Sequence, residues 1–137
     1  MKRLLFLTVL FITFLANSQV QPSTKYAQTI TDKELKELLY VYASDYFAGR
    51  EAGTRGQKLA VDFLKNHYID LGISPAKGTN PSYFQTMKLI IDRKVVATEN
   101  VAALITGSEK PNEYIIITSH LDHIGTHEGE INNGADD

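Results

Sequence analysis

Hydrophobic positions in the first half of the chain recur at helical spacing. Leu35, Leu38, Leu39 and Tyr42 share one helical face. The residues before them, 31–34, read Thr-Asp-Lys-Glu, which is the capping-box pattern of a helix N-terminus. The pattern predicts a helix that begins near this cap and packs its apolar face on a sheet.

A second helical stretch follows another cap signature, in which Thr54 is followed three residues later by Gln57. Apolar residues then repeat at helical spacing as far as Leu71, and Gly72 predicts where the helix ends. His67 lies on the apolar stripe of this helix, and nothing around it has the spacing of metal ligands. We expect a packed or partly exposed helical histidine there, not a metal ligand.

The second half of the chain changes to short runs of aromatic, β-branched and apolar residues. Residues 83–91 and 100–106 predict strands, and residues 95–96 predict a partner for the first of them across a turn. Residues 114–118 are nearly all apolar and predict a central strand buried on both faces. The expected fold class is α/β, with a mixed β-sheet sandwiched by helices. Such a sheet would place His120 at a carboxyl strand end, where ligands bind.

The last eighteen residues hold three of the four histidines and five acidic residues. His120 and Asp122 lie two positions apart, so on an extended chain the Asp122 carboxylate can orient an imidazole that binds a metal. Asp137 follows a Gly-Ala step and can return a second oxygen ligand to the same point. We expect His123 and His127 to be loop or substrate-side residues, and zinc prefers about four ligands.

Two sequence segments in this window resemble a known metal site. Residues 119–125, Ser-His-Leu-Asp-His-Ile-Gly, and residues 133–137, Asn-Gly-Ala-Asp-Asp, are similar to the first half of the metal site of metallopeptidase family 28, the co-catalytic zinc aminopeptidases. Residues 45–56 resemble the family's Gly-Arg-Glu-x-Gly-Thr segment, and residues 99–101 its Asn-Val strand start. The resemblance covers roughly residues 31–137.

The resemblance implies a secreted aminopeptidase that binds two zinc ions and acts on peptides or proteins with free amino termini. His120 would bind one zinc, Asp137 would bridge both, and Asp122 would orient His120. The general base and the remaining ligands would lie downstream, so residues 31–137 would be the amino-terminal part of a peptidase domain, inactive on its own. Two alternatives stay open: an inactive, truncated binding module, and a glutaminyl-cyclase-like aminoacyl transferase with one zinc.

Arg50 and Glu51 lie in a loop bounded by glycines, between the two predicted helices. Charged residues in such loops often take part in function. The other interpretation is a loop-fixing ion pair or an interaction with a helix end. The sequence alone leaves both interpretations open.

The first eighteen residues have the pattern of a secretory signal peptide. Lys2 and Arg3 form a basic start, residues 4–15 are uncharged and mostly apolar, and residues 16–18 form a small-x-small step. The apolar run is shorter than the ~20 residues that cross a bilayer as a helix, so we expect no stable membrane anchor. Residues 19–30 are polar and predict a flexible lead-in.

The amino-acid composition limits the cellular locations and the binding partners that we expect for the protein. The chain has no cysteine, so no disulfide supports the fold. Loss of Lys2 and Arg3 with a signal peptide leaves twelve basic and sixteen acidic residues, a net charge of −4. A net negative charge does not attract the negatively charged backbone of nucleic acid, so we expect no nucleic-acid partner. The expected location is secreted or periplasmic.

We predict that the exported protein begins at or near Gln19, because the small-x-small step at residues 16–18 is a typical cleavage site. Amino-terminal sequencing of the exported protein checks this. Membrane-bound protein that retains Met1 would contradict it.

Overall fold

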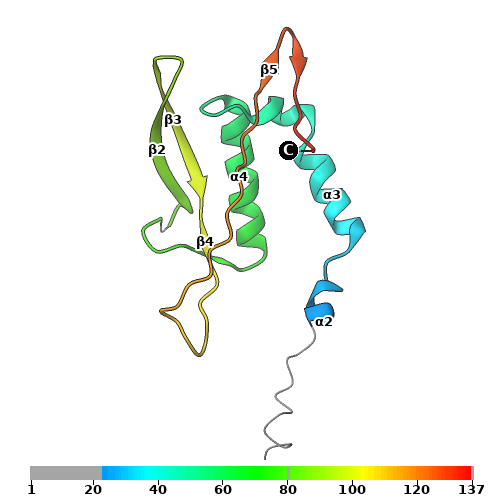
Figure 1. The fold of residues 1–137 in the computed structure, drawn as a ribbon, viewed down its shortest axis with the longest axis vertical. Helices are drawn as coiled ribbons and strands as arrows, with labels where there is room; N and C mark the ends of the chain where they lie inside the picture. Colours follow the sequence, from blue (N-terminus) through cyan, green and yellow to red (C-terminus); the bar gives the residue numbers. More distant parts are fainter. Residues whose placement is uncertain (1–22, 80, 137) are drawn as a thin grey trace, which may run out of the picture. The chain divides into compact units, whose positions relative to one another are not determined.

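The computed structural model describes residues 23–79 and 81–136. Contacts within the chain divide it into two units, residues 1–36 and 37–137. The predicted signal peptide, residues 1–18, lies outside the described residues. Figure 1 shows the helices and strands in chain order.

Two helices lie near the start of the described chain. Helix α2, Ser23–Ala27, falls inside the predicted lead-in, and helix α3 spans Asp32–Tyr42. The predicted capping box is formed: the Glu34 amide donates to the Thr31 hydroxyl at 3.2 Å, and the Thr31 amide donates to the Glu34 carboxylate at 3.2 Å. The Thr31 hydroxyl also donates to the Glu34 carboxylate at 2.7 Å, and this bond, followed by the one from the Thr31 amide, holds the pKa of the Glu34 carboxyl below its usual value.

Helix α3 corrects one expectation, because it buries none of its residues. Leu35 and Leu39 are about half exposed, so the apolar face is not packed on a sheet. Its cap and spacing specify a helix, whereas packing also needs a surface to pack on. Among the described residues, no helix is long and apolar enough to cross a membrane.

Helix α4, Arg55–Asp70, begins where the cap signature predicts. The Thr54 hydroxyl accepts from the Gln57 amide at 3.5 Å and donates to the Glu51 carbonyl at 2.6 Å. Gly56 lets the preceding segment approach, because a Cβ built on it would lie 2.0 Å from the Phe47 carbonyl oxygen. The start of α4 is therefore shaped to receive the turn before it.

The end of α4 also follows the sequence signal. Gly72 has φ +68°, a left-handed conformation that suits glycine. Its amide donates to the Ile69 carbonyl, and the Ile73 amide donates to the Tyr68 carbonyl, each at 2.9 Å. These two bonds form the Schellman motif that commonly closes helices.

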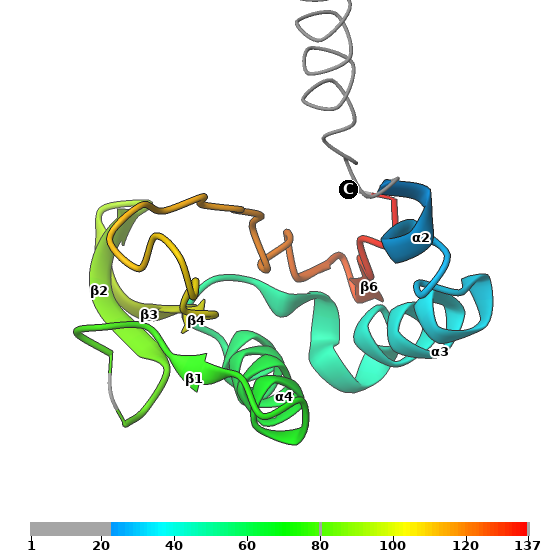
Figure 2. The ribbon, with the colours of Figure 1, turned by 90° about the horizontal axis from the view of Figure 1, so that it is seen from below.

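A β-hairpin forms the largest sheet. Strand β2, Phe84–Ile91, pairs antiparallel with β3, Lys94–Val101, and the register runs from Phe84 opposite Val101 to Ile91 opposite Lys94. Asp92 and Arg93 form the two-residue turn and both have positive φ, as a type I′ hairpin requires. The predicted turn and partner strand are confirmed, and β2 and β3 run side by side (Figure 2). Strand β3 is longer than the predicted residues 95–96.

Two short antiparallel pairs complete the described sheets. Strand β1, Ser74–Pro75, pairs with β4, Ala103–Leu104, and β5, Thr126–His127, pairs with β6, Glu130–Ile131. The fold is thus broadly α/β, a mixture of helices and small antiparallel sheets. The predicted strand 100–106 is correct in part, because its residues divide between the end of β3 and β4.

The predicted central strand over residues 114–118 is wrong in this structure. The segment belongs to no strand, and the side chains of Ile115 and Ile117 are 96% and 93% exposed. A strand buried on both faces needs neighbouring strands and covering layers, and the described sheets each hold two strands that pair with one another. His120 consequently lies on an exposed, irregular segment rather than at a rigid strand end.

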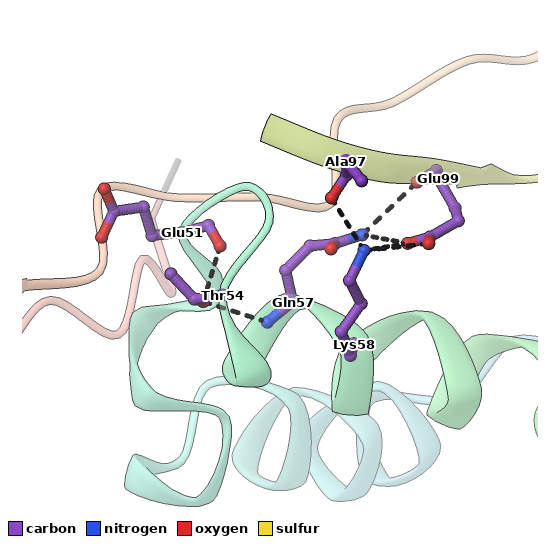
Figure 3. Close-up of polar contacts among 6 residues, drawn as sticks. All are labelled: Glu51, Thr54, Gln57, Lys58, Ala97 and Glu99. Carbon is purple, nitrogen blue, oxygen red and sulfur yellow. Dashed lines mark hydrogen bonds and ion pairs between the residues drawn. The ribbon is translucent and has the colours of Figure 1, made fainter. Parts of the chain in front are cut away.

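Helix α4 is joined to β3 by a polar cluster, which Figure 3 shows. The Lys58 ammonium donates to the Ala97 carbonyl at 2.9 Å and to the Glu99 carboxylate at 2.7 Å. Gln57 is almost fully buried, and its amide nitrogen donates to the same carboxylate at 3.3 Å. The hairpin is held on the helix by these contacts.

The apolar core next to α4 is aromatic. Phe47 is 2% exposed, and its ring centroid lies 5.7 Å from those of both Tyr42 and Phe63. Ala60 and Val61 of α4 are also buried. Each buried aromatic side chain removes a large apolar area from water, so this cluster stabilises the turn between α3 and α4.

Thr54→Ala should lower the free energy of unfolding by about 1 kcal/mol, because the cap of α4 loses its side-chain acceptor. Thr54→Ser keeps the hydroxyl and should recover most of this loss. Urea denaturation checks both, and Thr106→Ala, at an exposed loop position, is the control. Equal losses at Thr54 and Thr106 would contradict the cap.

Candidate metal centre

The sequence-predicted site residues lie at the C-terminal end of the chain. His120 and Asp122 are exposed, and Asp137 lies outside the described residues. The Nδ1 atom of His120 lies 3.0 Å from the main-chain carbonyl oxygen of Asp122. A carbonyl oxygen accepts hydrogen bonds, so Nδ1 is the donor in this contact, and in the neutral ring the lone pair is then on Nε2.

This contact differs in detail from the expected one, in which the Asp122 carboxylate holds the imidazole. The carbonyl of the same residue is the partner here. Either group can orient a histidine ligand, since both are common partners of the non-ligating ring nitrogen. The role of the carboxylate stays a prediction.

The buried Arg50 side chain connects the segments that carry the candidate ligands. It is 3% exposed. Its Nε donates to Leu121 O at 3.0 Å, Nη1 to Tyr42 O at 2.9 Å and Asn133 O at 2.8 Å, and Nη2 to Gly134 O at 3.0 Å. One guanidinium therefore bonds the end of α3 and two segments near the C-terminus, one at Leu121 and the other at Asn133 and Gly134.

The backbone before Arg50 is shaped for this arrangement. Ala48, Gly49 and Arg50 have positive φ values of 45°, 70° and 52°. The Gly125 amide donates to the Gly49 carbonyl at 3.1 Å, and the His123 amide donates to the Arg50 carbonyl at 3.4 Å. A Cβ at Gly49 would lie 2.5 Å from the Gly125 carbonyl oxygen, so only glycine permits this approach.

We name the two bonded segments the histidine arm, residues 119–125, and the C-terminal arm, residues 132–136. They also contact one another, because the Asn132 amide donates to Gly125 O at 2.9 Å. The β5–β6 hairpin joins them, and the sequence reasoning did not predict it. Gly129 was the residue in the sequence that could have indicated this hairpin, because it has φ +88° in the two-residue turn between the strands.

The structure distinguishes the two interpretations of the Arg50 loop. To the described residues, the Arg50 guanidinium makes four hydrogen bonds, and all of them end on main-chain carbonyls. Its role is therefore loop-fixing, through carbonyl groups rather than an ion pair. Glu51 is exposed, and its side chain lies so close to Gly125 that a Cβ there would be 2.6 Å from Glu51 Oε2.

Tyr42 supports the same arrangement from the other side. Its ring centroid lies 4.5 Å from Arg50 Cζ, a cation–π distance, and its hydroxyl donates to Leu121 O at 3.0 Å. The pKa of the Tyr42 hydroxyl is raised above its usual value, mainly because the group is buried. The positive charge of Arg50 opposes this rise, and the negative charge of Asp122 adds to it.

The other histidines lie apart from this contact. The ring of His123 lies against Gly134, where a Cβ would be 2.6 Å from the ring carbon Cγ. His127 lines a polar surface depression together with Glu128, Glu130 and Asn132. His67 is partly buried on α4, as its place on the apolar stripe predicts.

Within residues 23–79 and 81–136, no group of three or more His, Cys, Asp or Glu side chains could hold a metal ion. The contact of His120 Nδ1 with Asp122 O is of the kind that orients a histidine ligand, and the binding of zinc by His120 stays a prediction. Comparison of the chain with protein-family models, curated proteins and solved structures found no match.

Tyr42→Phe should lower the free energy of unfolding by about 0.5 kcal/mol at neutral pH, because Leu121 O keeps its bond from Arg50. The folded pKa of Tyr42 is raised, so its stabilising contribution is complete below about pH 10, the unfolded value, and is lost as the pH rises further.

Unfolding measured between neutral and strongly alkaline pH should therefore show a steeper alkaline loss in the wild type than in Tyr42→Phe. Tyr114→Phe, at an exposed position, is the control and should retain the wild-type slope. Identical slopes in the wild type and Tyr42→Phe would contradict the buried environment of Tyr42.

Proposed function

We propose that this chain contributes to a secreted zinc aminopeptidase that hydrolyses N-terminal peptide bonds through a metal-activated water. The single observation that supports the proposal is that Arg50 bonds the arm of the His120-x-Asp122 motif and the arm leading to Asp137. One side chain thus holds two segments that are separated in the sequence, one at Leu121 and the other at Asn133 and Gly134.

Each residue has a definite task in this proposal. His120 binds metal through Nε2, and the contact of Nδ1 with Asp122 O fixes the tautomer and the plane of the ring. Asp137 supplies a carboxylate oxygen, and the Asp122 carboxylate raises the basicity of the imidazole. When bound, zinc would supply an activated water and would polarise the scissile carbonyl.

The proposal requires more ligands than these two, because zinc binds about four. It therefore predicts further ligands and a general-base carboxylate from a longer form of the chain. It also includes the finer architecture, a mixed sheet sandwiched by helices, in which residues 114–118 would need additional strands beside them. The exposed Ile115, Ile116 and Ile117 are compatible with that requirement.

We expect the 137-residue chain to bind zinc weakly and to show no turnover of an aminoacyl-anilide. His120→Ala and Asp137→Ala should each abolish the zinc binding, since each removes a ligand. Asp122→Asn should weaken it by about 10- to 100-fold, the range for a residue that orients a ligand. Calorimetric titration with zinc and an anilide assay measure both quantities.

His67→Ala is the matched control, because it removes a histidine on α4 and should leave the zinc affinity unchanged. Wild-type zinc affinity in His120→Ala would overturn the ligand assignment. Metal-dependent hydrolysis by the 137-residue chain would show that the site is built from other residues.

A further inference from the structure

We propose that Arg50 is a positioning residue for the metal centre: it fixes the histidine arm and the C-terminal arm relative to one another before any metal binds. This inference rests on the proposed function, because the ligands it positions are those of the proposed zinc site. Arg50 touches neither the metal nor the substrate, and it acts through the main chain of both arms.

The residues that Arg50 contacts are near the candidate ligands in the sequence. Leu121, whose carbonyl accepts from Nε at 3.0 Å, is the direct neighbour of His120. Gly134, whose carbonyl accepts from Nη2 at 3.0 Å, precedes Asp137 by three residues. The guanidinium is planar and its donors form a rigid fork, so the carbonyls that it binds are held in a fixed mutual geometry.

Two further features favour Arg50 over water or another side chain as the connecting group. The side chain is 3% exposed, so solvent has little access to replace its bonds. Its own carbonyl accepts from the His123 amide at 3.4 Å, so backbone and side chain hold the histidine arm together. A lysine offers one compact charge on a flexible stem and cannot reproduce the fork.

The polar cluster on β3 provides a control of similar structural weight. Lys58 donates to Ala97 O and to the Glu99 carboxylate, and so joins α4 to the hairpin through bonds to β3. Lys58→Met should lower stability without moving either arm. It separates a general loss of stability from a loss of positioning.

The first measurement needs no metal. The chain has no cysteine, so spin labels can be attached at Ser119→Cys and Ala135→Cys, both exposed positions, without background. Electron paramagnetic resonance should give a narrow distance distribution between the arms in the otherwise wild-type chain and in Lys58→Met. Arg50→Lys should broaden it, because one ammonium cannot hold carbonyls of both arms in place.

The second measurement is zinc titration of the unlabelled chains. Arg50→Lys should bind zinc about 10- to 100-fold more weakly than the wild type, as expected for a residue that orients ligands. Lys58→Met should retain the wild-type affinity. Unchanged distances and affinity in Arg50→Lys would overturn the inference, and so would equal losses in Arg50→Lys and Lys58→Met.

Failure of the proposed function gives a different result. In that case the wild type binds no zinc, although Arg50→Lys still broadens the distance distribution between the arms. The role of Arg50 in positioning metal ligands then fails together with the proposed function.

If Arg50→Lys does not fold, Arg50→Ala is measured in millimolar guanidinium chloride and, as a control, in sodium chloride of equal concentration. Guanidinium alone should restore the narrow distribution and the zinc affinity, and failure to restore either overturns the inference.

Discussion

The described site depends on one buried positive charge. Transferring a guanidinium from water into a protein costs several kcal/mol unless hydrogen bonds replace its hydration. Arg50 meets this condition with four carbonyl contacts between 2.8 and 3.0 Å and with the face of the Tyr42 ring. The charge is therefore satisfied only while α3, the histidine arm and the C-terminal arm keep their relative places.

The hairpin and the site are fixed to the rest of the fold by different contacts. The Lys58 and Gln57 side chains hold β3 on α4, whereas the turn before α4 carries Phe47 in the core and Arg50 in the site. The turn before α4 packs closely on the helix at Gly56, because this residue has no side chain that would clash with the Phe47 carbonyl. Loosening the hairpin should thus affect stability more than the geometry of the arms.

Local signals in the sequence predicted local structure well. The caps at Thr31 and Thr54 and the stop at Gly72 each depend on a few neighbouring residues, and each is formed. The strand over residues 114–118 could not be predicted in the same way, because burial of a strand depends on partners elsewhere in the chain. The apolar composition of residues 114–118 indicates that they can form a strand, but it does not indicate which strands would pair with them.

The site was predictable to a smaller extent. The spacing of His120 and Asp122 predicted a contact between the two residues, but spacing does not distinguish a carboxylate from the carbonyl of the same residue. The partners of Arg50 could not be predicted either, because main-chain carbonyls are present at every position and carry no sequence signal. Three successive residues with positive φ bring Arg50 to them, and only the glycine among these three indicated such a turn.

The proposed site depends on the joint ordering of the histidine arm and the C-terminal arm. Amide hydrogen exchange tests it directly, because the Gly125 and Asn132 amides donate to carbonyls in this arrangement, at 3.1 and 2.9 Å. Both amides should be protected without metal, while Ile116 on the exposed segment exchanges rapidly. If Gly125 and Asn132 exchange as fast as Ile116, the arms are not held together and the account is contradicted.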